Sequence, residues 1–379
     1  MKTIALASNS SWYLFNFRRS SIRKLIEMGY EVICFSPRDD YSKELRALGC
    51  KCVHIPIQND GRNPIQDLRL LLCLYKFYKL HRPIAIFHFT IKLNIYGGIA
   101  AWLNSIPSVS NVSGLGTAFL DKGFLNFLVK ILYKLSQRFV FKIFCQNQDD
   151  FSLLLEKKLV PKNKLFLLPG SGVDLVRFHP NLRKNRKKNK YFTFLYVGRM
   201  LLDKGLYELV SAISSINSKQ VVCNLVLCGF EGNANHSNIP LALLKEWDNL
   251  PGIQWIGPTD HVETVMSQAD AIVLPSYREG MPKTILEAFA MSIPVVATNV
   301  AGCSNIVDDG VNGMLCLPRD IKSLEDKLVK MMGIGHEARV KMGLSGRAKV
   351  KKNYDEKIVV NSLEKTVKEI ETLNLHINQ

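Results

Sequence analysis

Short apolar runs alternate along the chain with longer segments in which apolar residues recur every three to four positions. The runs predict β-strands, and the periodic segments predict amphipathic helices. In the first half we expect strands at 4–7, 31–35, 52–56, 84–89, 108–112 and 139–145, and helices at 15–28, 64–80, 92–103 and 124–138. Because strands and helices alternate, this order predicts a parallel sheet covered by helices.

The same alternation restarts at Tyr191, after a basic segment at 182–190. Expected strands lie at 192–197, 222–228, 253–256, 271–274 and 295–298, and expected helices at 204–216, 241–247, 262–269 and 284–291. A chain of 379 residues is long enough for two domains. We therefore expect an α/β fold in which two Rossmann-like, doubly wound parallel-sheet domains face a cleft. The expected domains are 1–180 and 190–350, with a helix at 351–379 that packs back toward the first domain. The basic segment is interpreted as a solvated linker, with a tether that contacts phosphates as the alternative.

The composition of the chain says more about its binding partners than about its fold. The net charge of +17 favours anionic partners, whether nucleic acid, anionic lipid or phosphorylated substrates. No apolar run approaches the ~18 residues of a membrane-spanning helix, and the N-terminal run is too short for a signal peptide. We therefore expect the chain to stay in the cytoplasm. The nine cysteines form no Cys-x-x-Cys pair, which indicates reduced core residues rather than zinc ligands or disulfides.

Two carboxylates eight positions apart mark the segment 278–302, REGMPKTILEAFAMSIPVVATNVAG. Glu279 lies in the loop expected after strand 271–274, and Glu287 lies about one turn into the following helix. The residues between them at the expected helix start are Gly280, Met281, Pro282 and Lys283. A helix N-terminus offers unpaired N–H donors that suit phosphate or sugar oxygens, and a carboxylate accepts hydrogen bonds from sugar hydroxyls. The alternative is that both carboxylates are solvent-facing charges at a helix start.

A pair of cations follows the first strand of the second domain. Arg199 and Lys204 stand five positions apart in the segment 198–205, GRMLLDKG. An arginine can fork onto a diphosphate, and a lysine can add a point charge. Because both motifs follow strands of one sheet, they can converge on one ligand, although a surface arginine and a surface lysine would give the same spacing.

These residues resemble the signature of glycosyltransferase family 4, whose members are retaining nucleotide-sugar transferases of GT-B fold. The matching residues are Gly198-Arg199, Lys204-Gly205, Glu279-Gly280-Met281-Pro282 and Glu287-Ala288. Further likeness is found at 171–174 with Phe178 and Pro180, at Ala301-Gly302 and at 309–313. The likeness covers nearly the whole chain and is strong in its second half.

The resemblance implies a role for each matching residue. Glu287 would bind the ribose of the nucleotide, and Glu279 would contact the transferred sugar. Arg199 and Lys204 would stabilise the diphosphate leaving group, so that Glu279, Arg199 and Lys204 are the catalytic candidates. The backbone of 280–283 would line the sugar and the phosphates. The resemblance implies neither a metal nor another cofactor, and the chain contains no Asp-x-Asp triplet.

Acceptor recognition is expected in the first domain. The candidate residues are Ser10, Arg18, Lys92, Asn111 and Gly114. This block resembles the branch that extends undecaprenyl-diphosphate-linked glycans, and transferases that add α-1,3-linked N-acetylgalactosamine are similar in pattern. Many family members carry a histidine in the loop at 112–116, where this chain has none, so no general base is assigned.

The expected function is transfer of an N-acetylhexosamine, such as N-acetylgalactosamine, from a UDP-sugar to an undecaprenyl-diphosphate-linked saccharide. The product would enter a surface polysaccharide, such as O-antigen or capsule, or another glycan. The alternatives are transfer of galactose, glucose or mannose in the same pathway, and a nucleotide-sugar epimerase of the same fold. Nucleic acid is not an expected partner, because the basic residues are dispersed and no nucleic-acid module is found.

A basic stripe in the first domain bears on location. Lys130, Lys134, Arg138 and Lys142 recur every four positions within 121–144, beside aliphatic and aromatic residues. Such a helix suits the surface of an anionic bilayer, and 68–82 is similar. The alternative is an ordinary amphipathic helix packed on the sheet. We expect the protein to lie on the inner face of the cytoplasmic membrane as a peripheral protein.

Overall fold

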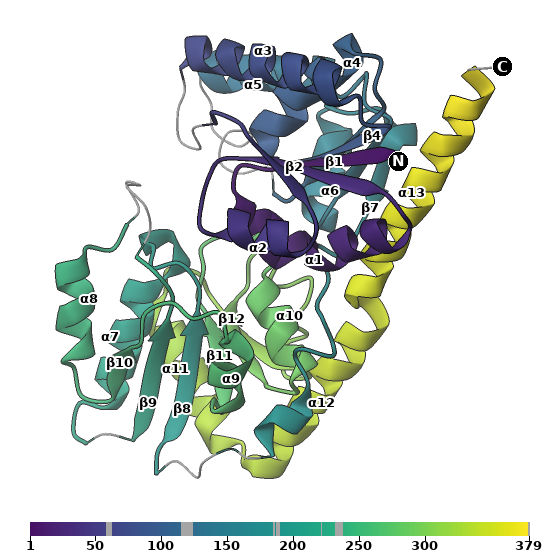
Figure 1. Cartoon of the computed structure of the whole chain (residues 1–379). Helices are drawn as coiled ribbons and strands as arrows, with labels where there is room; N and C mark the ends of the chain where they lie inside the picture. The colour runs from purple at the N-terminus through teal and green to yellow at the C-terminus, as the bar shows by residue number, and fades with distance from the viewer. Residues whose placement is uncertain are drawn as a thin grey trace. The chain divides into compact units, whose positions relative to one another are not determined.

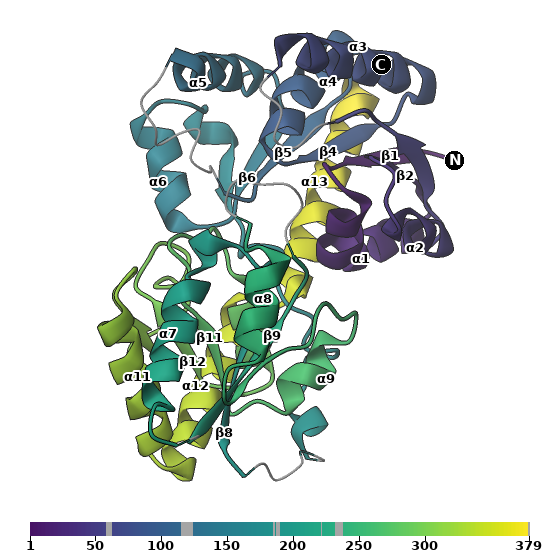
Figure 2. The same cartoon turned by 90° about the vertical axis from the view of Figure 1, so that its left-hand side faces the viewer.

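The computed structural model describes residues 1–57, 63–114, 124–184, 186, 190–220, 222–231 and 238–377. The chain divides into two compact units (Figures 1 and 2). Unit 1 comprises Met1–Ser171 and Glu356–Gln379, and unit 2 comprises Gly172–Asp355. The first change of unit therefore falls ahead of the basic segment 182–190, and the C-terminal segment belongs to unit 1.

In its described part, unit 1 contains a parallel sheet of seven strands in the order β3-β2-β1-β4-β5-β6-β7. The strands are β1 (Thr3–Ala7), β2 (Glu31–Ser36), β3 (Lys51–His54), β4 (Ala85–Phe89), β5 (Ser108–Val112), β6 (Lys142–Cys145) and β7 (Leu165–Leu167). The helices include α2 (Tyr41–Ala47), the π-helical turn Leu93–Gly97, α5 (Phe124–Ser136) and α6 (Gln148–Glu156). The direction of winding reverses between the neighbouring strands β1 and β4.

Helices cover both faces of this sheet because its side chains alternate between two cores. On β1, Ile4 and Leu6 join one core, whereas Ala5 and Ala7 join another. The first core also contains residues of α1 (Ser11–Glu27) and α13 (Glu356–Ile377), and the second contains residues of α3 (Pro64–His81) and α4 (Gly98–Leu103). The last helix of the chain is therefore part of the core of unit 1 (Figure 1).

In its described part, unit 2 contains a parallel sheet of six strands in the order β10-β9-β8-β11-β12-β13. The strands are β8 (Phe192–Val197), β9 (Cys223–Cys228), β10 (Ile253–Trp255), β11 (Ala271–Leu274), β12 (Val295–Thr298) and β13 (Gly313–Cys316). The helices are α7 (Leu206–Ile216), α8 (Leu241–Asp248), α9 (Val262–Ser267), α10 (Lys283–Ala290), α11 (Ile321–Gly333) and α12 (His336–Asn353). Here the winding reverses between β8 and β11.

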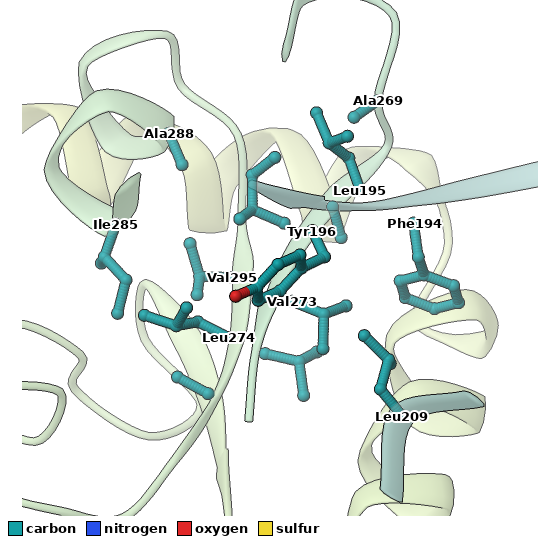
Figure 3. Close-up of a cluster of buried hydrophobic side chains, with 14 of the residues drawn as sticks. Phe194, Leu195, Tyr196, Leu209, Ala269, Val273, Leu274, Ile285, Ala288 and Val295 are labelled. Atoms are coloured by element: carbon teal, nitrogen blue, oxygen red, sulfur yellow. The ribbon is translucent and has the colours of Figure 1, made fainter. Parts of the chain in front are cut away.

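The core of unit 2 surrounds these central strands. Phe194 of β8 lies beside Leu209 of α7, while Ile285 and Ala288 of α10 lie on the other side of the cluster (Figure 3). Tyr196, also on β8, is fully buried, and its hydroxyl donates a hydrogen bond to the Arg199 carbonyl at 2.8 Å. The core thus fixes the end of β8 and the loop that follows it.

The expected α/β class, with two doubly wound parallel sheets flanked by helices, is confirmed. The predicted strand at 139–145 is shorter, because only Lys142–Cys145 pairs with its neighbours. The predicted helix at 92–103 begins with the π-helical turn and becomes α-helical only at Gly98.

Candidate active site

The two motifs of unit 2 follow the two strands between which its winding reverses. β8 and β11 are hydrogen-bonded neighbours, with Phe194 opposite Ala271 and Leu195 opposite Ile272. The segment 198–205 leaves the carboxyl end of β8, and the segment 275–282 leaves the carboxyl end of β11. In doubly wound sheets this switch point is where ligands bind, so the fold brings the motifs together at the appropriate edge.

Glu279 and Lys204 form an ion pair across these two loops. The Lys204 Nζ lies 2.6 Å from the Glu279 Oε1, and the Ser276 hydroxyl donates to the same oxygen at 2.7 Å. The two charged side chains are only 14% and 17% exposed. Two residues singled out from sequence motifs 75 positions apart therefore meet in the fold. Ser276 was not singled out, although it stands two positions after β11, the strand that leads into the motif.

Glycines allow the backbones of these segments to approach each other closely. Gly205 has φ +70°, and a Cβ at this position would lie 2.1 Å from the Pro275 carbonyl oxygen. Gly302 has φ +83°, and a Cβ there would lie 2.6 Å from the Gly280 carbonyl oxygen and 2.7 Å from that of Glu279. Side chains at both positions would displace the loop that carries Glu279.

Gly205→Ala is expected to lower the free energy of unfolding by about 2 kcal/mol, because alanine adds both a strained φ and a clash with Pro275. Gly310→Ala is the matched control, since Gly310 has φ +78° but no heavy atom within 4 Å of the added Cβ. Thermal unfolding of the two variants separates the clash from the backbone strain. Equal shifts in melting temperature would show that the added methyl group is accommodated near Pro275 without a loss in the free energy of unfolding.

The helix start lies where the sequence places it. α10 begins at Lys283, and Pro282 is its N-cap residue with φ −73° and ψ 102°. The N-cap residue Pro282 makes no side-chain capping hydrogen bond, and the first N–H groups of a helix lack intrahelical partners, which suits an anionic or hydroxyl-rich ligand.

Glu287 is a buried carboxylate on α10, with a relative exposure of 8%. Burial raises the pKa of Glu287, while Lys283 and Arg177 act in the opposite direction. The Lys283 Nζ lies 3.8 Å from the Glu287 Oε1. The Arg177 guanidinium donates from Nε at 2.9 Å and from Nη2 at 2.8 Å to the Glu263 Oε2. Because Glu287 is buried among charged groups, its carboxylate is a stronger hydrogen-bond acceptor than an exposed carboxylate at a helix start would be. Neither Arg177 nor Glu263 was singled out from the sequence.

Arg199 contrasts with these paired groups. It is exposed, and it forms no ion pair with any residue that the structure describes. Its carbonyl is fixed by the Tyr196 hydroxyl, so the backbone is anchored while the guanidinium is available to an incoming anion.

The acceptor candidates in unit 1 are less closely grouped. Ser10 caps α1 by accepting a hydrogen bond from the Tyr13 N–H at 3.1 Å, and Lys92 forms an ion pair with Asp67 at 2.9 Å. Asn111 is buried at the end of β5 and donates to the His88 carbonyl at 3.2 Å. Gly114 is the last described residue before the gap at 115–123. Ser10 and Lys92 follow β1 and β4, the strands at the switch point of unit 1.

Arg18 is buried rather than presented at a surface. Its exposure is 2%, its guanidinium carbon lies 4.5 Å from the centroid of the Phe89 ring, and Nη2 donates to the Tyr13 hydroxyl at 3.3 Å. The side chain therefore packs against aromatic rings, which ties α1 to the end of β4.

His88 lies next to one of these candidates, because its carbonyl accepts the hydrogen bond from Asn111. It is fully buried, its Nε2 lies 3.0 Å from the Tyr78 hydroxyl, and burial lowers the pKa of the imidazole to about 3. His88 is therefore neutral and is enclosed by protein, so it does not supply the general base that the sequence left unassigned.

An apolar surface with basic residues lies on α4, α5 and the residues that follow α5. We call it the α4–α5 surface; it comprises Trp102, Leu103, Phe127, Leu128, Lys130, Ile131, Lys134, Leu135, Arg138 and Phe139. The Trp102 and Phe139 rings stack with centroids 4.2 Å apart, and both are exposed. Lys142, which the sequence placed in the same basic stripe, instead pairs with Glu369 of α13 at 2.5 Å. The positions 121–123 of the predicted stripe lie outside the described residues.

The described residues contain neither a membrane-spanning helix nor a metal-binding cluster. None of the helices there is both long enough and apolar enough to span a bilayer. Over the same ranges, no group of three His, Cys, Asp or Glu side chains is arranged to hold a metal ion.

Comparison with known proteins gives consistent matches over both units. Residues 178–349 match the family model of glycosyl transferases group 1, and residues 3–147 match the model described as glycosyl transferase 4-like. A relative from Campylobacter jejuni is an N,N'-diacetylbacillosaminyl-diphospho-undecaprenol α-1,3-N-acetylgalactosaminyltransferase; it is 26% identical, over 94% of this chain and 96% of its own. An Escherichia coli relative, a UDP-Gal:α-D-GlcNAc-diphosphoundecaprenol α-1,3-galactosyltransferase, is 26% identical over 70% of this chain and 71% of its own.

Solved structures agree with the fold. Anabaena HepE in complex with UDP-glucose superposes with a TM-score of 0.79, at 15% identity, over 97% of this chain and 100% of that one. At this level of identity the match bears on the fold alone.

Proposed function

Since the chain belongs to the group 1 glycosyltransferases of GT-B fold, we propose that it is a retaining enzyme that transfers a sugar from a UDP-sugar to an undecaprenyl-diphosphate-linked saccharide. We propose an N-acetylhexosamine as the transferred sugar, with N-acetylgalactosamine as the first choice, in the assembly of a surface polysaccharide. The names of the Campylobacter jejuni and Escherichia coli relatives support the lipid-linked acceptor. The observation that carries the proposal is the Lys204–Glu279 ion pair at the switch point of unit 2.

On the donor side, each group is matched to one part of a UDP-sugar. Arg199 and Lys204 would bind the diphosphate and stabilise the charge that develops on it as the bond to the sugar breaks. The start of α10, with Gly280 to Lys283, would offer N–H groups to phosphate and sugar oxygens. Glu287 would accept the ribose hydroxyls, and Glu279 would contact the transferred sugar. Because two cations and a helix start supply positive charge, we propose that the reaction needs no metal.

The proposed transfer breaks the bond between the sugar C1 and the diphosphate oxygen and forms a bond from C1 to the acceptor hydroxyl oxygen, whose proton passes to the departing diphosphate. The acceptor would approach on the face from which the diphosphate departs, which retains the configuration at C1. No side chain is assigned as a covalent nucleophile. Glu279 is held by Lys204 and Ser276 in a manner suited to orientation, and it is not assigned as a glycosidase-type acid or base.

The donor and acceptor are tested together in one panel. The protein is incubated with UDP-GalNAc, UDP-GlcNAc, UDP-galactose, UDP-glucose and GDP-mannose, with and without a short polyprenyl-diphosphate-linked sugar. We expect acceptor-dependent UDP release, and NMR should show an α-linkage in the product. A product from another hexose would support the alternative donor, and conversion of the UDP-sugar without acceptor would support an epimerase. Release of nucleotide from none of the donors would overturn the proposal.

We propose that unit 1 attaches the enzyme to an anionic membrane through the α4–α5 surface. Exposed Trp102 and Phe139 suit the interface between headgroups and acyl chains, and Lys134 and Arg138 suit anionic headgroups. Attachment would bring the transferase to a lipid-linked acceptor.

The double variant Lys134→Ala/Arg138→Ala is expected to bind phosphatidylglycerol-containing vesicles about 30-fold more weakly, because each basic residue near such a surface contributes roughly 1 kcal/mol. Lys351→Ala/Lys352→Ala removes two exposed positive charges from α12 of unit 2 and serves as the matched control. Vesicle co-sedimentation at constant ionic strength is the measurement. Equal losses in the two double variants would indicate general charge attraction and contradict a specific surface.

A further inference from the structure

The Glu279 carboxylate is held through one of its two oxygens. In the described part of the chain, the hydrogen bonds from Lys204 Nζ and from the Ser276 hydroxyl both end on Oε1. The two donors come from different segments, since Lys204 follows β8 and Ser276 follows β11. This arrangement fixes the position of Oε1 from two sides.

Ser276 is the more rigid of the two donors. It is fully buried, and its carbonyl accepts a hydrogen bond from the hydroxyl of Thr298, a buried residue at the end of β12. Its side chain has a single rotatable bond that positions the oxygen. Lys204, by contrast, carries an ammonium group on a flexible four-carbon stem.

The two donors also differ in what a ligand would do to them. A diphosphate at the switch point would compete with Glu279 for the Lys204 ammonium, because a phosphate oxygen is also a strong anionic acceptor. The Ser276 hydroxyl is enclosed between its own loop and Glu279, and it gains no comparable competitor. After the donor binds, the hydrogen bond from Ser276 is the contact that keeps the carboxylate in place.

We propose that Ser276 is a positioning residue that holds the Glu279 carboxylate for the transferred sugar while Lys204 turns to the diphosphate. This inference rests on the proposed function, since it assigns Glu279 to the sugar and Lys204 to the leaving group. It makes Ser276 important for sugar transfer and unimportant for binding of the nucleotide portion.

The test compares Ser276→Ala with a matched substitution in the same unit. Ser267 is also buried, at 3% exposure, and its hydroxyl donates to the Thr264 carbonyl at 2.7 Å within α9, outside the segments 198–205 and 278–302. Ser267→Ala therefore removes a similar buried hydroxyl without touching Glu279. For each variant, kcat and KM are measured with the UDP-sugar that reacts fastest in the panel above, and the Kd of UDP alone is measured by calorimetry.

We expect Ser276→Ala to lower kcat about tenfold, with UDP bound within twofold of wild type, because the ionised Glu279 carboxylate loses a hydrogen bond that holds it in place. Ser276→Cys keeps a weaker donor of similar size, and its kcat should lie between those of wild type and Ser276→Ala. Ser267→Ala should retain the wild-type kcat.

The outcomes separate this inference from the proposed function. If wild type transfers sugar and Ser276→Ala matches it in kcat, the positioning role is overturned and the function stands. If Ser276→Ala weakens UDP as much as it lowers kcat, the serine merely supports the loop, and the inference is again overturned. If wild type neither binds UDP nor turns over any UDP-sugar, the proposed function fails and this inference fails with it.

Discussion

Replacing Lys204 by Met is expected to lower kcat for sugar transfer about 100-fold and to weaken UDP binding. Removing one group that stabilises developing negative charge typically costs roughly 10²–10³ in rate. Lys204 is the paired cation at the switch point of unit 2, 2.6 Å from Glu279, and methionine keeps the length of the side chain without its charge. Steady-state kinetics and calorimetry with UDP measure the two effects.

Substitution of Glu279, the other member of this ion pair, separates the effect on kcat from the effect on UDP binding. Glu279→Gln should also lower kcat, yet UDP should bind at least as tightly as in wild type, because Lys204 loses its competing carboxylate. Lys245→Met, in which an exposed lysine of α8 is replaced, is the control for Lys204→Met. A Lys204→Met enzyme with wild-type kcat would remove Lys204 from the mechanism, whatever its effect on UDP.

Replacing Glu287 by Gln is expected to raise the donor KM about tenfold and at the same time to raise the melting temperature at neutral pH. The loss of affinity follows from the proposed ribose contact, since a charged acceptor makes stronger hydrogen bonds than an amide. The gain in stability follows because burial raises the pKa of Glu287, which means that the ionised carboxylate is less favourable in the folded protein than in the unfolded chain. The acceptor KM should change little, and equal changes in both KM values would contradict the ribose role.

The stability and the donor KM of the wild-type enzyme should both depend on pH through the raised pKa of Glu287. With a raised pKa, Glu287 favours folding when protonated, and this contribution is lost as the pH rises from the ordinary carboxylate pKa of 4.5 through the raised value. Donor binding needs the ionised form, so the donor KM should increase as the pH falls through that window, above pH 4.5. Glu287→Gln should abolish both trends, which a titration of melting temperature and of donor KM can establish.

The periodicity of the chain predicts the layers of both units because central strands such as β1 and β11 are short apolar runs. The motif residues could be located as well: β8 and β11 each end just before a motif, and alternating strands and helices imply that such loops share an edge. The sequence carries no direct sign that Lys204 contacts Glu279 itself. Both were expected to meet a ligand, and the ion pair follows only from the strand order and the φ of Gly205.

Arg18 and Lys142 differ in how far their surroundings could be predicted from the sequence. The role of Arg18 in acceptor binding stays a prediction; its side chain lies on the same face of α1 as Leu14, Ile22 and Leu25, all of them buried. The spacing of four residues on either side was a usable signal that this arginine points inward. Lys142 had no such signal, because the helix that covers it, α13, lies more than 200 residues later in the chain.

The return of α13 to the core of unit 1 sets an order of assembly on the ribosome. Unit 2 is complete once Asp355 has left the exit tunnel, whereas the first face of unit 1 still lacks Val359, Leu363, Val367 and Ile370. The unit whose synthesis starts first is therefore the one whose core closes last. Until then, the apolar face formed by α1 and the strands beneath it is open to water, and a nascent chain stopped at Ser171 would keep it open.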